Sequence, residues 1–483
     1  MKISGKLDKD LNILKSLISS DDVIFTDVKA GENNGVLIFV SDIVDKAVIG
    51  QLIMKPLSKL KGEVTEKTLS GKFLSPETET SSDTDYIADK IVSGSAALLI
   101  DGINKVFIFG LKKFDKRAIA EPPTSTVIKG PREGFVESLQ VNVSLIRRKL
   151  KTPKLKFKYI KTGNYSNTDI ALCYIDGIAD KGILSVLEKK IKSIKIDAVL
   201  DSSYVSKFLG EHKTSLFKQV GNTEKPDILA AKILEGRVAV LVDGSPIVLT
   251  LPYLLVEDFQ SPSDYYSSSY NATLARILRL AAVFISLFLP AFFVAAELFH
   301  LQLIPLSFLL TIVNSIKGIP LSPSYEMFFT LLIFEILNEA SVRMPRYVGM
   351  VVSIVGGLVL GETAVNAGII SAPALMIIAL SGICLYTVPE LEQTFSVIRL
   401  LFLLIGGSIG IYGVLIASAA LFIYLVSFET YKTPLLAPFS PLITKDLKDG
   451  IYKGFMIEQN LRPLSLKNAN KKRMSDGGEN GDD

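Results

Sequence analysis

Three ionisable side chains recur every four residues within an apolar stretch in the second half of the chain. Glu335, Glu339 and Arg343 belong to the segment EMFFTLLIFEILNEASVR, residues 326–343. Four residues turn an α-helix by one full turn plus only about 40°, so a helix here carries the three groups in one stripe. Carboxylates that face lipid are costly, so this stripe should face a bundle interior, a partner or water. Two interpretations stay open: a buried ion-pair stripe that fixes helix packing, or a polar lining for ions.

The next apolar stretch, residues 347–370, combines two polar side chains with small residues. Glu362 and Asn366 are the polar ones. The small residues are spaced so that one side of a helix is almost without side chains, which lets another backbone approach closely or leaves room for ions or water. We therefore predict pore or gating residues Glu335, Glu339, Arg343, Glu362 and Asn366, and helix-packing residues Gly357, Gly361, Ala364 and Gly368.

A third group of candidate residues lies between the two halves of the chain, in the segment EDFQSPSDYYSS. Asp258, Asp264, Tyr265 and Tyr266 could form a hydrogen-bonded junction that couples the soluble and membrane parts. A plain linker is the alternative.

Composition excludes several classes of function. The 483 residues carry a net charge of only +4, without a dense basic patch, so we expect no nucleic-acid partner. His212 and His300 are the only histidines, one in each half, which excludes a His-based triad or a two-His zinc site in the soluble half. No phosphate-binding glycine loop lies between a strand and a helix. We predict that the protein is not an enzyme and that it has no cofactor and no metal site.

Residues 1–270 are predicted to be a soluble α/β region. One expected helix has apolar positions at 7, 11, 14 and 18, and a second is expected to begin after a Ser41 cap. Further helices are expected at 86–92, 132–150, 180–191 and 227–234. The expected strands cover 23–28, 36–40, 96–100, 105–109, 155–160, 170–175 and 198–200, with a hairpin at 238–251 and a polar loop at 61–85.

The order of these elements starts again after residue 150. The segment IVSGSAALLIDG at 91–102 aligns without a gap with ILEGRVAVLVDG at 233–244, and VLIFVSDIVDKAVI at 36–49 resembles IALCYIDGIADKGIL at 170–184, with Asp45 over Asp180. We interpret the match as an internal duplication into two similar subdomains. Chance similarity between two helix–turn–hairpin units is the alternative, because Asp-Gly turns between apolar strands are common.

Beyond residue 270 the sequence predicts an all-α membrane domain of five or six spans. The apolar stretches are 275–299, 303–316, 326–343, 347–370, 373–388 and 394–428, of which 303–316 is expected to be interfacial or re-entrant. The stretch 394–428 is either two short crossings joined at a glycine turn or one long tilted helix. Six spans are preferred because they place the basic residues flanking the spans on the cytoplasmic side.

The predicted domains are therefore 1–131 and 132–270 for the two subdomains, 271–430 for the membrane domain and 431–483 for a cytoplasmic segment with a disordered tail. The N-terminus MKISGKLDKDLN has no apolar run behind its charges and does not read as a secretory signal.

Several segments resemble, in order, the A subunits of GerA-family spore germinant receptors between about residues 20 and 445. They are PREGFVESLQVNVSLIRRKL, VLDSSYVSKFL, TEKPDILAAKILEGRVAVLVDGSPIVLTLPYLLVEDFQSPSDYY, GLVLGETAVNAGIISAPALMIIAL and LLAPFSPL. One departure is SFETYKTPLLAPFSP, where Glu429 and Thr430 follow Phe428 in place of the family's usual Ser-Phe-Gly approach to a Pro-Tyr pair.

The resemblance implies a multi-pass protein of the spore inner membrane whose N-terminal domain faces the spore core. It implies a transporter-like B subunit and a C-subunit lipoprotein as partners, a homo-oligomer, and a nutrient-gated cation channel that starts germination. A non-conducting signalling scaffold, which passes a signal from a partner subunit, is the alternative.

Overall fold

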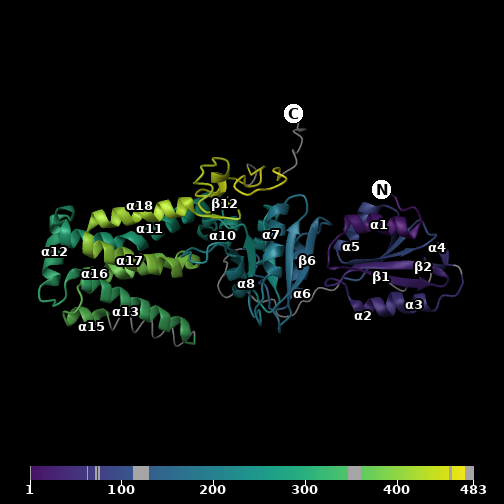
Figure 1. Ribbon diagram of the computed structural model, residues 1–483, viewed down its shortest axis with the longest axis horizontal. Coiled ribbons are helices and arrows are strands. Elements are labelled where there is room, and N and C mark those ends of the chain that lie inside the picture. Colours follow the sequence, from purple (N-terminus) through teal and green to yellow (C-terminus); the bar gives the residue numbers. More distant parts are fainter. Residues whose placement is uncertain are drawn as a thin grey trace. The chain divides into compact units, whose positions relative to one another are not determined.

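A computed structural model of the chain describes residues 2–62, 64–70, 73, 77–112, 130–345, 361–455 and 459–473 (Figure 1). The described residues group into two compact units. The first draws on Met1–Tyr253, Thr430–Thr433 and Met456–Asp483, and the second on Leu254–Glu429 and Pro434–Phe455. The first is α/β and the second is mainly helical.

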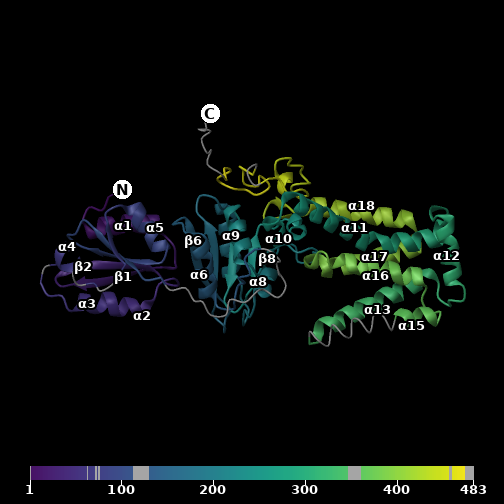
Figure 2. The same ribbon diagram turned by 180° about the vertical axis from the view of Figure 1, so that it is seen from behind.

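The first unit contains two five-stranded antiparallel sheets. One has the order β1 (Val23–Ala30), β2 (Asn33–Val40), β4 (Ser95–Ile100), β5 (Val106–Gly110) and β3 (Thr78–Ser81). Its helices are α1 (Leu7–Leu17), α2 (Lys46–Ile49), α3 (Lys55–Ser58), α4 (Glu66–Ser70) and α5 (Thr84–Val92), with a short π-helix at Gly50–Met54 between α2 and α3. Figure 2, seen from behind, shows α1 and α5 on one side of this sheet and α2 and α3 on the other.

The second sheet has the order β6 (Leu155–Thr162), β7 (Thr168–Ile175), β9 (Val238–Val242), β10 (Val248–Leu251) and β8 (Gly221–Thr223). Its helices are α6 (Leu139–Lys149), α7 (Lys181–Lys192), α8 (Ser202–Leu209) and α9 (Pro226–Leu234). Apolar side chains from the helices fill the core on both faces of the sheet.

The repeated sequence pattern corresponds to a repeated fold. In the first sheet Leu37 of β2 lies opposite Leu98 of β4, and in the second Leu172 of β7 lies opposite Val240 of β9. These are the residues that the two sequence alignments superpose, so strand order and register both recur. The helix caps recur too, because the Asp45 and Asp180 carboxylates each accept backbone N–H groups at a helix start.

Four local predictions in this unit were wrong. The helix predicted from Ser41 begins at Lys46 instead, where Asp45 caps it, and the predicted loop 61–85 contains α4 and β3. The helix predicted from residue 132 begins at Leu139, because Phe135 donates its backbone N–H to the Glu224 carbonyl and is held in an extended segment. Residues 198–200 form no strand and lead into α8.

Part of the C-terminal segment contacts the first unit. Residues 459–473 belong to the first unit, where Ala469 donates its backbone N–H to the Ile178 carbonyl and Arg462 Nε donates to the Leu234 carbonyl at 2.7 Å. Residues 474–483 lie outside the described part of the chain, so the disordered tail stays a prediction.

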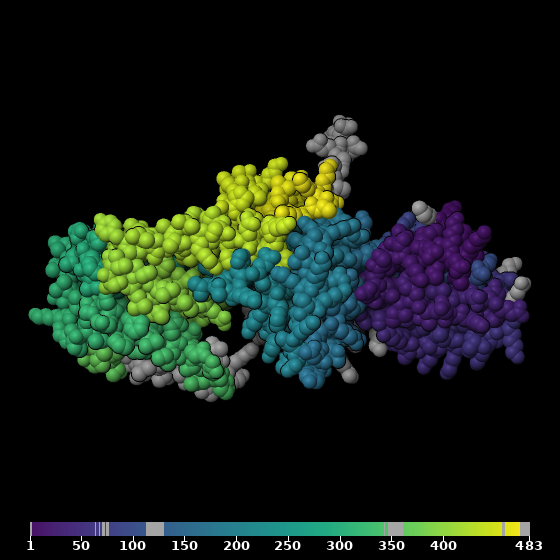
Figure 3. Space-filling model, viewed as in Figure 1, coloured from purple at the N-terminus to yellow at the C-terminus, as the bar shows by residue number. Residues whose placement is uncertain are grey.

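A buried ion pair joins the two subdomains, whose residues adjoin one another in the space-filling view (purple and blue in Figure 3). Arg147 of α6 donates from Nε and Nη2 to the two carboxylate oxygens of Asp22, both at 2.8 Å, and both side chains are fully buried. Its guanidinium also lies 5.0 Å from the centre of the Phe157 ring. Since neither charge reaches water, each depends on the other.

The second unit begins with a short helical turn, Leu255–Phe259, and α10 (Pro262–Tyr266). Its longer helices are α11 (Ser269–Phe299), α12 (Leu306–Ile316), α13 (Pro323–Arg343), α16 (Ala372–Leu385), α17 (Glu392–Ile409) and α18 (Ile411–Ser427), and α15 (Gly361–Asn366) is short. In the described part of this unit, two helical segments, Ser269–Phe299 and Pro389–Ile409, are long and apolar enough to cross a membrane. The shorter apolar helices are α12, α16 and α18.

A sharp turn separates α17 from α18. Gly410 has a φ of +80°, and a Cβ there would lie 3.0 Å from the Phe299 ring, so the position needs glycine. Phe395 near the start of α17 and Phe422 near the end of α18 line one cavity, so the two helices run antiparallel. The single long helix that we considered for 394–428 is wrong. The number of membrane crossings stays a prediction.

We predict that Asp22→Asn lowers the free energy of unfolding by about 3–5 kcal/mol, because it leaves the Arg147 charge buried and unpaired. Glu66→Gln is the control, since the Lys105–Glu66 ion pair is about half exposed and should contribute little. Circular dichroism of the purified protein during denaturant unfolding measures both. Equal losses in the two variants would contradict this role for the Asp22–Arg147 pair.

Candidate functional site

The predicted polar stripe on α13 is divided between two environments. Arg343 Nε donates to Glu339 Oε1 at 2.6 Å within the same helix, and both side chains are largely exposed, at 78% and 63%. Glu335 instead turns to another helix. Since α13 is continuous through Arg343, the three side chains keep the predicted helical spacing, but they have different partners.

Glu335 pairs with an arginine that lies within α17. Arg399 Nη2 donates to Glu335 Oε1 at 2.5 Å, and Arg399 Nη1 donates to Ser381 Oγ of α16 at 2.9 Å. Ser381 Oγ in turn donates to the Ser286 carbonyl of α11 at 2.8 Å. The Arg399 side chain is 1% exposed and that of Glu335 31%. One guanidinium thus connects four helices, and we call Glu335, Arg399, Ser381 and Ser286 the Arg399 network.

Further polar contacts extend along the interface between α13 and α17. Ser324 Oγ donates to the Gly407 carbonyl at 3.0 Å, and Asn338 Nδ2 donates to Glu392 Oε1 at 2.8 Å. The contact later in α13, at Asn338, has its partner earlier in α17, at Glu392. The two helices are therefore antiparallel. A Cβ at Gly407 would lie 2.5 Å from Ser324 Oγ, which explains why a small residue stands there.

Glu326 is a buried carboxylate, 1% exposed, that the sequence analysis used only as a segment boundary. Its Oε1 accepts the backbone N–H of Ser371 at 2.6 Å, immediately before α16. A negative charge at a helix N-terminus is favoured by the helix dipole and satisfies a free N–H group. Glu326 thus fixes α13 to the start of α16.

The residues around α15 show different environments. Glu362 and Asn366 are exposed, and Ala364 contacts the apolar core of the bundle. A Cβ at Gly361 would lie 3.1 Å from Leu375, so this glycine permits close packing. Gly368 has a φ of +66° and a Cβ there would meet nothing within 4 Å, so its backbone conformation rather than close packing explains the glycine. Gly357 lies outside the described residues.

Asp264 is the centre of a second charged network, near the start of α11. Its carboxylate accepts hydrogen bonds from Arg279 Nη1 and Nη2 at 2.7 and 2.8 Å and from Arg276 Nε at 3.3 Å. Arg276 also pairs with Asp449 at 3.1 Å, and the Tyr265 hydroxyl donates to Asp449 at 3.0 Å. We call these five residues the Asp264 network. All of them lie in the second unit.

The predicted junction residues divide into two pairs. The structure brings Asp264 and Tyr265 together in this network, whereas Asp258 lies half-buried in the preceding helical turn and Tyr266 is 40% exposed. Burial alone would raise the pKa of Asp264. The hydrogen bonds from Arg279 and Ser261 and the charges of Arg279 and Arg276 outweigh that effect, so its pKa lies below the ordinary value of 3.8.

Sequence reasoning missed Arg399, Glu326 and Asp449 as site residues. Arg399 could have been found as a lone arginine in the apolar stretch 394–428, because a charge there requires a partner at membrane depth. The identity of that partner, 64 residues earlier, had no local signal. Among the described residues no group of three or more His, Cys, Asp or Glu side chains could hold a metal ion.

Known proteins resemble this chain along most of its length. A family model described as Bacillus/Clostridium GerA spore germination protein matches residues 11–465. Spore germination protein KA of Bacillus subtilis (strain 168) is 36% identical over 485 residues, covering 98% of this chain and 88% of that protein. The uncharacterized membrane protein YfkQ of the same strain is 36% identical over 458 residues, covering 92% and 88%.

One solved structure is also similar. The N-terminal domain of the A subunit of the Bacillus megaterium spore germinant receptor GerK3 is 27% identical, covers 53% of this chain and 98% of its own, and superposes with a TM-score of 0.43.

We predict that Glu335→Gln destabilises the helical unit by about 3–5 kcal/mol, because Arg399 then stays buried without a counter-charge. The double variant Glu335→Leu/Arg399→Met should recover most of that loss, since it removes both charges. Unfolding of the purified protein in mixed micelles, followed by circular dichroism, measures the change. If the stability lost in the double variant equalled the sum of the losses in Glu335→Leu and Arg399→Met alone, the two charges would not depend on one another.

The depressed pKa of Asp264 predicts a specific acid sensitivity. Its stabilising contribution is complete above the pKa of the unfolded chain, about 3.9, and is lost as pH falls through the lower pKa of the folded protein. Asp264→Asn should be less stable at neutral pH, and the difference from the parent protein should shrink below about pH 4. Thermal unfolding at pH 7 and at decreasing pH tests this, and a difference independent of pH would refute it.

Proposed function

The chain belongs to the GerA family of spore germination proteins, and on this premise we propose that it is a membrane subunit of a nutrient-responsive germinant receptor. The names of its relatives support a role in germination. The apolar helices of the second unit and the membrane-protein name of one relative support a membrane location.

We propose further that the subunit forms or gates an oligomeric cation channel. The observation that carries this proposal is the exposure of Glu339, Glu362 and Asn366 in a single chain, on helices α13 and α15, which lie in sequence between the apolar helices α12 and α16. At membrane depth such groups are costly unless water or another subunit covers them. In a ring of subunits around a water-filled path, water and neighbouring subunits would cover these polar groups. Acidic side chains on such a path favour cations.

The Arg399 network suggests how such a channel could be held in one conformation. Its buried ion pair fixes α13, which carries the exposed Glu339, against α16 and α17. A change in the relative position of these helices would have to break or replace the Arg399–Glu335 contact. We propose that this contact stabilises the closed conformation.

A non-conducting signalling scaffold is the second candidate function. Glu335, the most buried member of the predicted stripe, is neutralised by Arg399 and is not free to line a path for ions. In that case the helices anchor the chain and the α/β unit passes the signal to another protein.

The remaining elements of the proposal concern location and partners. We place residues 271–430 in the spore inner membrane as six spans, with the subdomains 1–131 and 132–270 and the segment 431–483 on the spore-core side. A transporter-like B subunit and a C-subunit lipoprotein are the expected partners, with Asp258, Asp264, Tyr265 and Tyr266 at the junction that couples the soluble and membrane parts.

We predict that Glu362→Gln slows nutrient-triggered potassium release from spores. A carboxylate that stabilises a passing cation by about 1.4 kcal/mol would account for a tenfold change in rate. Asp8→Asn is the control, because Asp8 is an exposed carboxylate in the α/β unit. Protein level and partner assembly are measured in the same spores. Current through the purified complex in a lipid bilayer separates the two candidates: its presence excludes the scaffold, and its absence together with unchanged release in Glu362→Gln excludes the channel.

A further inference from the structure

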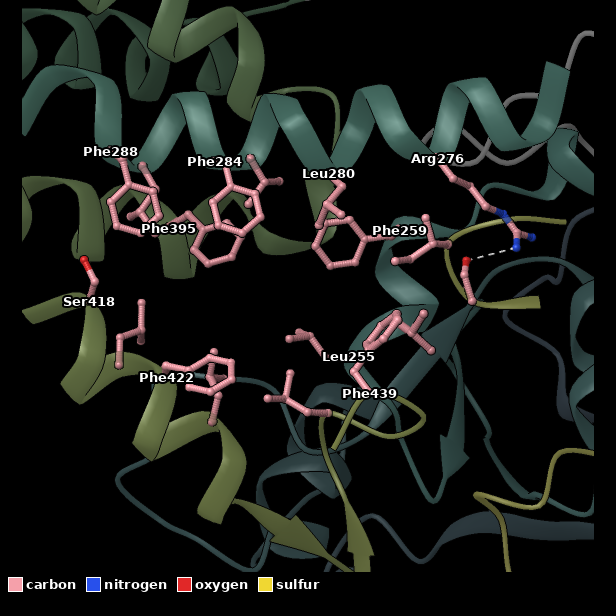
Figure 4. A pocket seen from close by; sticks show the side chains of 18 residues that line it. Leu255, Phe259, Arg276, Leu280, Phe284, Phe288, Phe395, Ser418, Phe422 and Phe439 are labelled. Carbon is pink, nitrogen blue, oxygen red and sulfur yellow. Dashed lines mark hydrogen bonds between the residues drawn. The ribbon is translucent and has the colours of Figure 1, made fainter. Parts of the chain in front are cut away.

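The helical unit contains a cavity of about 470 Å³ whose walls are almost entirely apolar (Figure 4). α11 forms one wall from Arg276 to Phe288, and α18 forms the opposite wall from Ser418 to Leu425. The helical turn Leu255–Phe259 and residues 436–451 close one end. The volume lies within the range of about 300–1,000 Å³ typical of small-molecule sites.

The two polar side chains that line the cavity are already engaged. Arg276 donates to Asp264, to Asp449 and to the carbonyls of Asp449 and Gly450, and the Ser418 hydroxyl donates to the Val414 carbonyl at 2.5 Å. Arg276 is thus held at one end of the cavity, and the other side chains that line it, apart from Ser418, are apolar. The cavity therefore favours an occupant that binds mainly by apolar contact, unlike free amino acids and sugars.

The shape of the cavity indicates a hydrocarbon chain. Arg276 and Phe288 are 12 residues apart on α11, a distance of about 18 Å along the helix axis. One leaflet of a bilayer contributes about 15 Å of hydrocarbon. Phe284 and Phe422, at 56% and 62% exposed, are apolar side chains left open at its edge, so the cavity is accessible from the side of the bundle.

We propose that this cavity binds one acyl chain of a membrane phospholipid. Its charged end, at Arg276, lies near the start of α11, and its apolar end, at Phe288, lies deeper in the helix. A chain entering from the leaflet at the start of α11 would follow this gradient of polarity. The inference rests on the membrane location proposed above and is independent of ion conduction.

The chain contains no tryptophan, so one substitution supplies a unique fluorescent reporter. Phe284→Trp places it at the cavity, and Leu310→Trp, on α12 and 55% exposed in the parent chain, is the matched control. Each purified variant in detergent is titrated with a phospholipid whose acyl chains carry bromine, which quenches tryptophan on contact. We expect Phe284→Trp to be half-quenched at a lipid fraction at least tenfold lower than Leu310→Trp.

Adding Ser418→Phe to Phe284→Trp fills the cavity and should bring the two quenching curves together. If Phe284→Trp does not fold, Leu425→Trp serves as a second reporter in the cavity. Coincident curves for the cavity and control reporters would overturn the proposal, as would quenching by brominated fatty acid but not by brominated phospholipid. In vesicles of brominated lipid, an unquenched Leu310→Trp would refute the membrane location itself, whereas a quenched control with no cavity preference refutes only the lipid site.

Discussion

The burial of the Arg399 guanidinium within an apolar bundle is the constraint on which much of the helical unit depends. An uncompensated charge at this depth is far more costly than any single apolar contact is favourable. Glu335 supplies the counter-charge from α13, and Ser381 supplies a hydrogen-bond acceptor from α16. These two requirements fix the positions of three helices around Arg399, and the close approach at Gly407 follows from the antiparallel packing that they impose.

The Asp264 network repeats the same solution nearer the start of α11. There two arginines on one helix face a buried aspartate, with Asp449 from much later in the chain completing the charge balance. Arg276 belongs to this network and Ser286 to the Arg399 network, and both lie on α11, ten residues and about 15 Å apart. A rigid helix held at both points cannot rotate or shift without disturbing one network or the other. α11 is therefore the element through which the two charged networks are mechanically linked.

Local sequence signals predicted much of the α/β unit but little of the candidate site. The recurrence of Gly94 and Gly102 as Gly236 and Gly244 was readable because turns with positive φ require glycine, and all four have that conformation. The start of α6 was misjudged because Phe135 continues the apolar spacing of the helix while its backbone pairs with Glu224. The partner of Arg399 was unreadable because Glu335 lies 64 residues earlier in the chain, on another helix. Periodicity identifies the face of a helix, whereas the pairing of charges is decided by tertiary packing.

The two charged networks keep the apolar cavity open. An apolar bundle without fixed charges would close around an empty space, because an unfilled cavity costs stability in proportion to its volume. Here α11 is held by Arg276 at one end of the cavity and by Ser286 near the other, so its wall is not free to move inward. Filling the space with a hydrocarbon chain removes the cost without disturbing either network. An occupant that fits between two charged anchors on α11 would then favour the arrangement of helices in which both networks are intact, so the membrane lipid itself would stabilise that conformation of the protein.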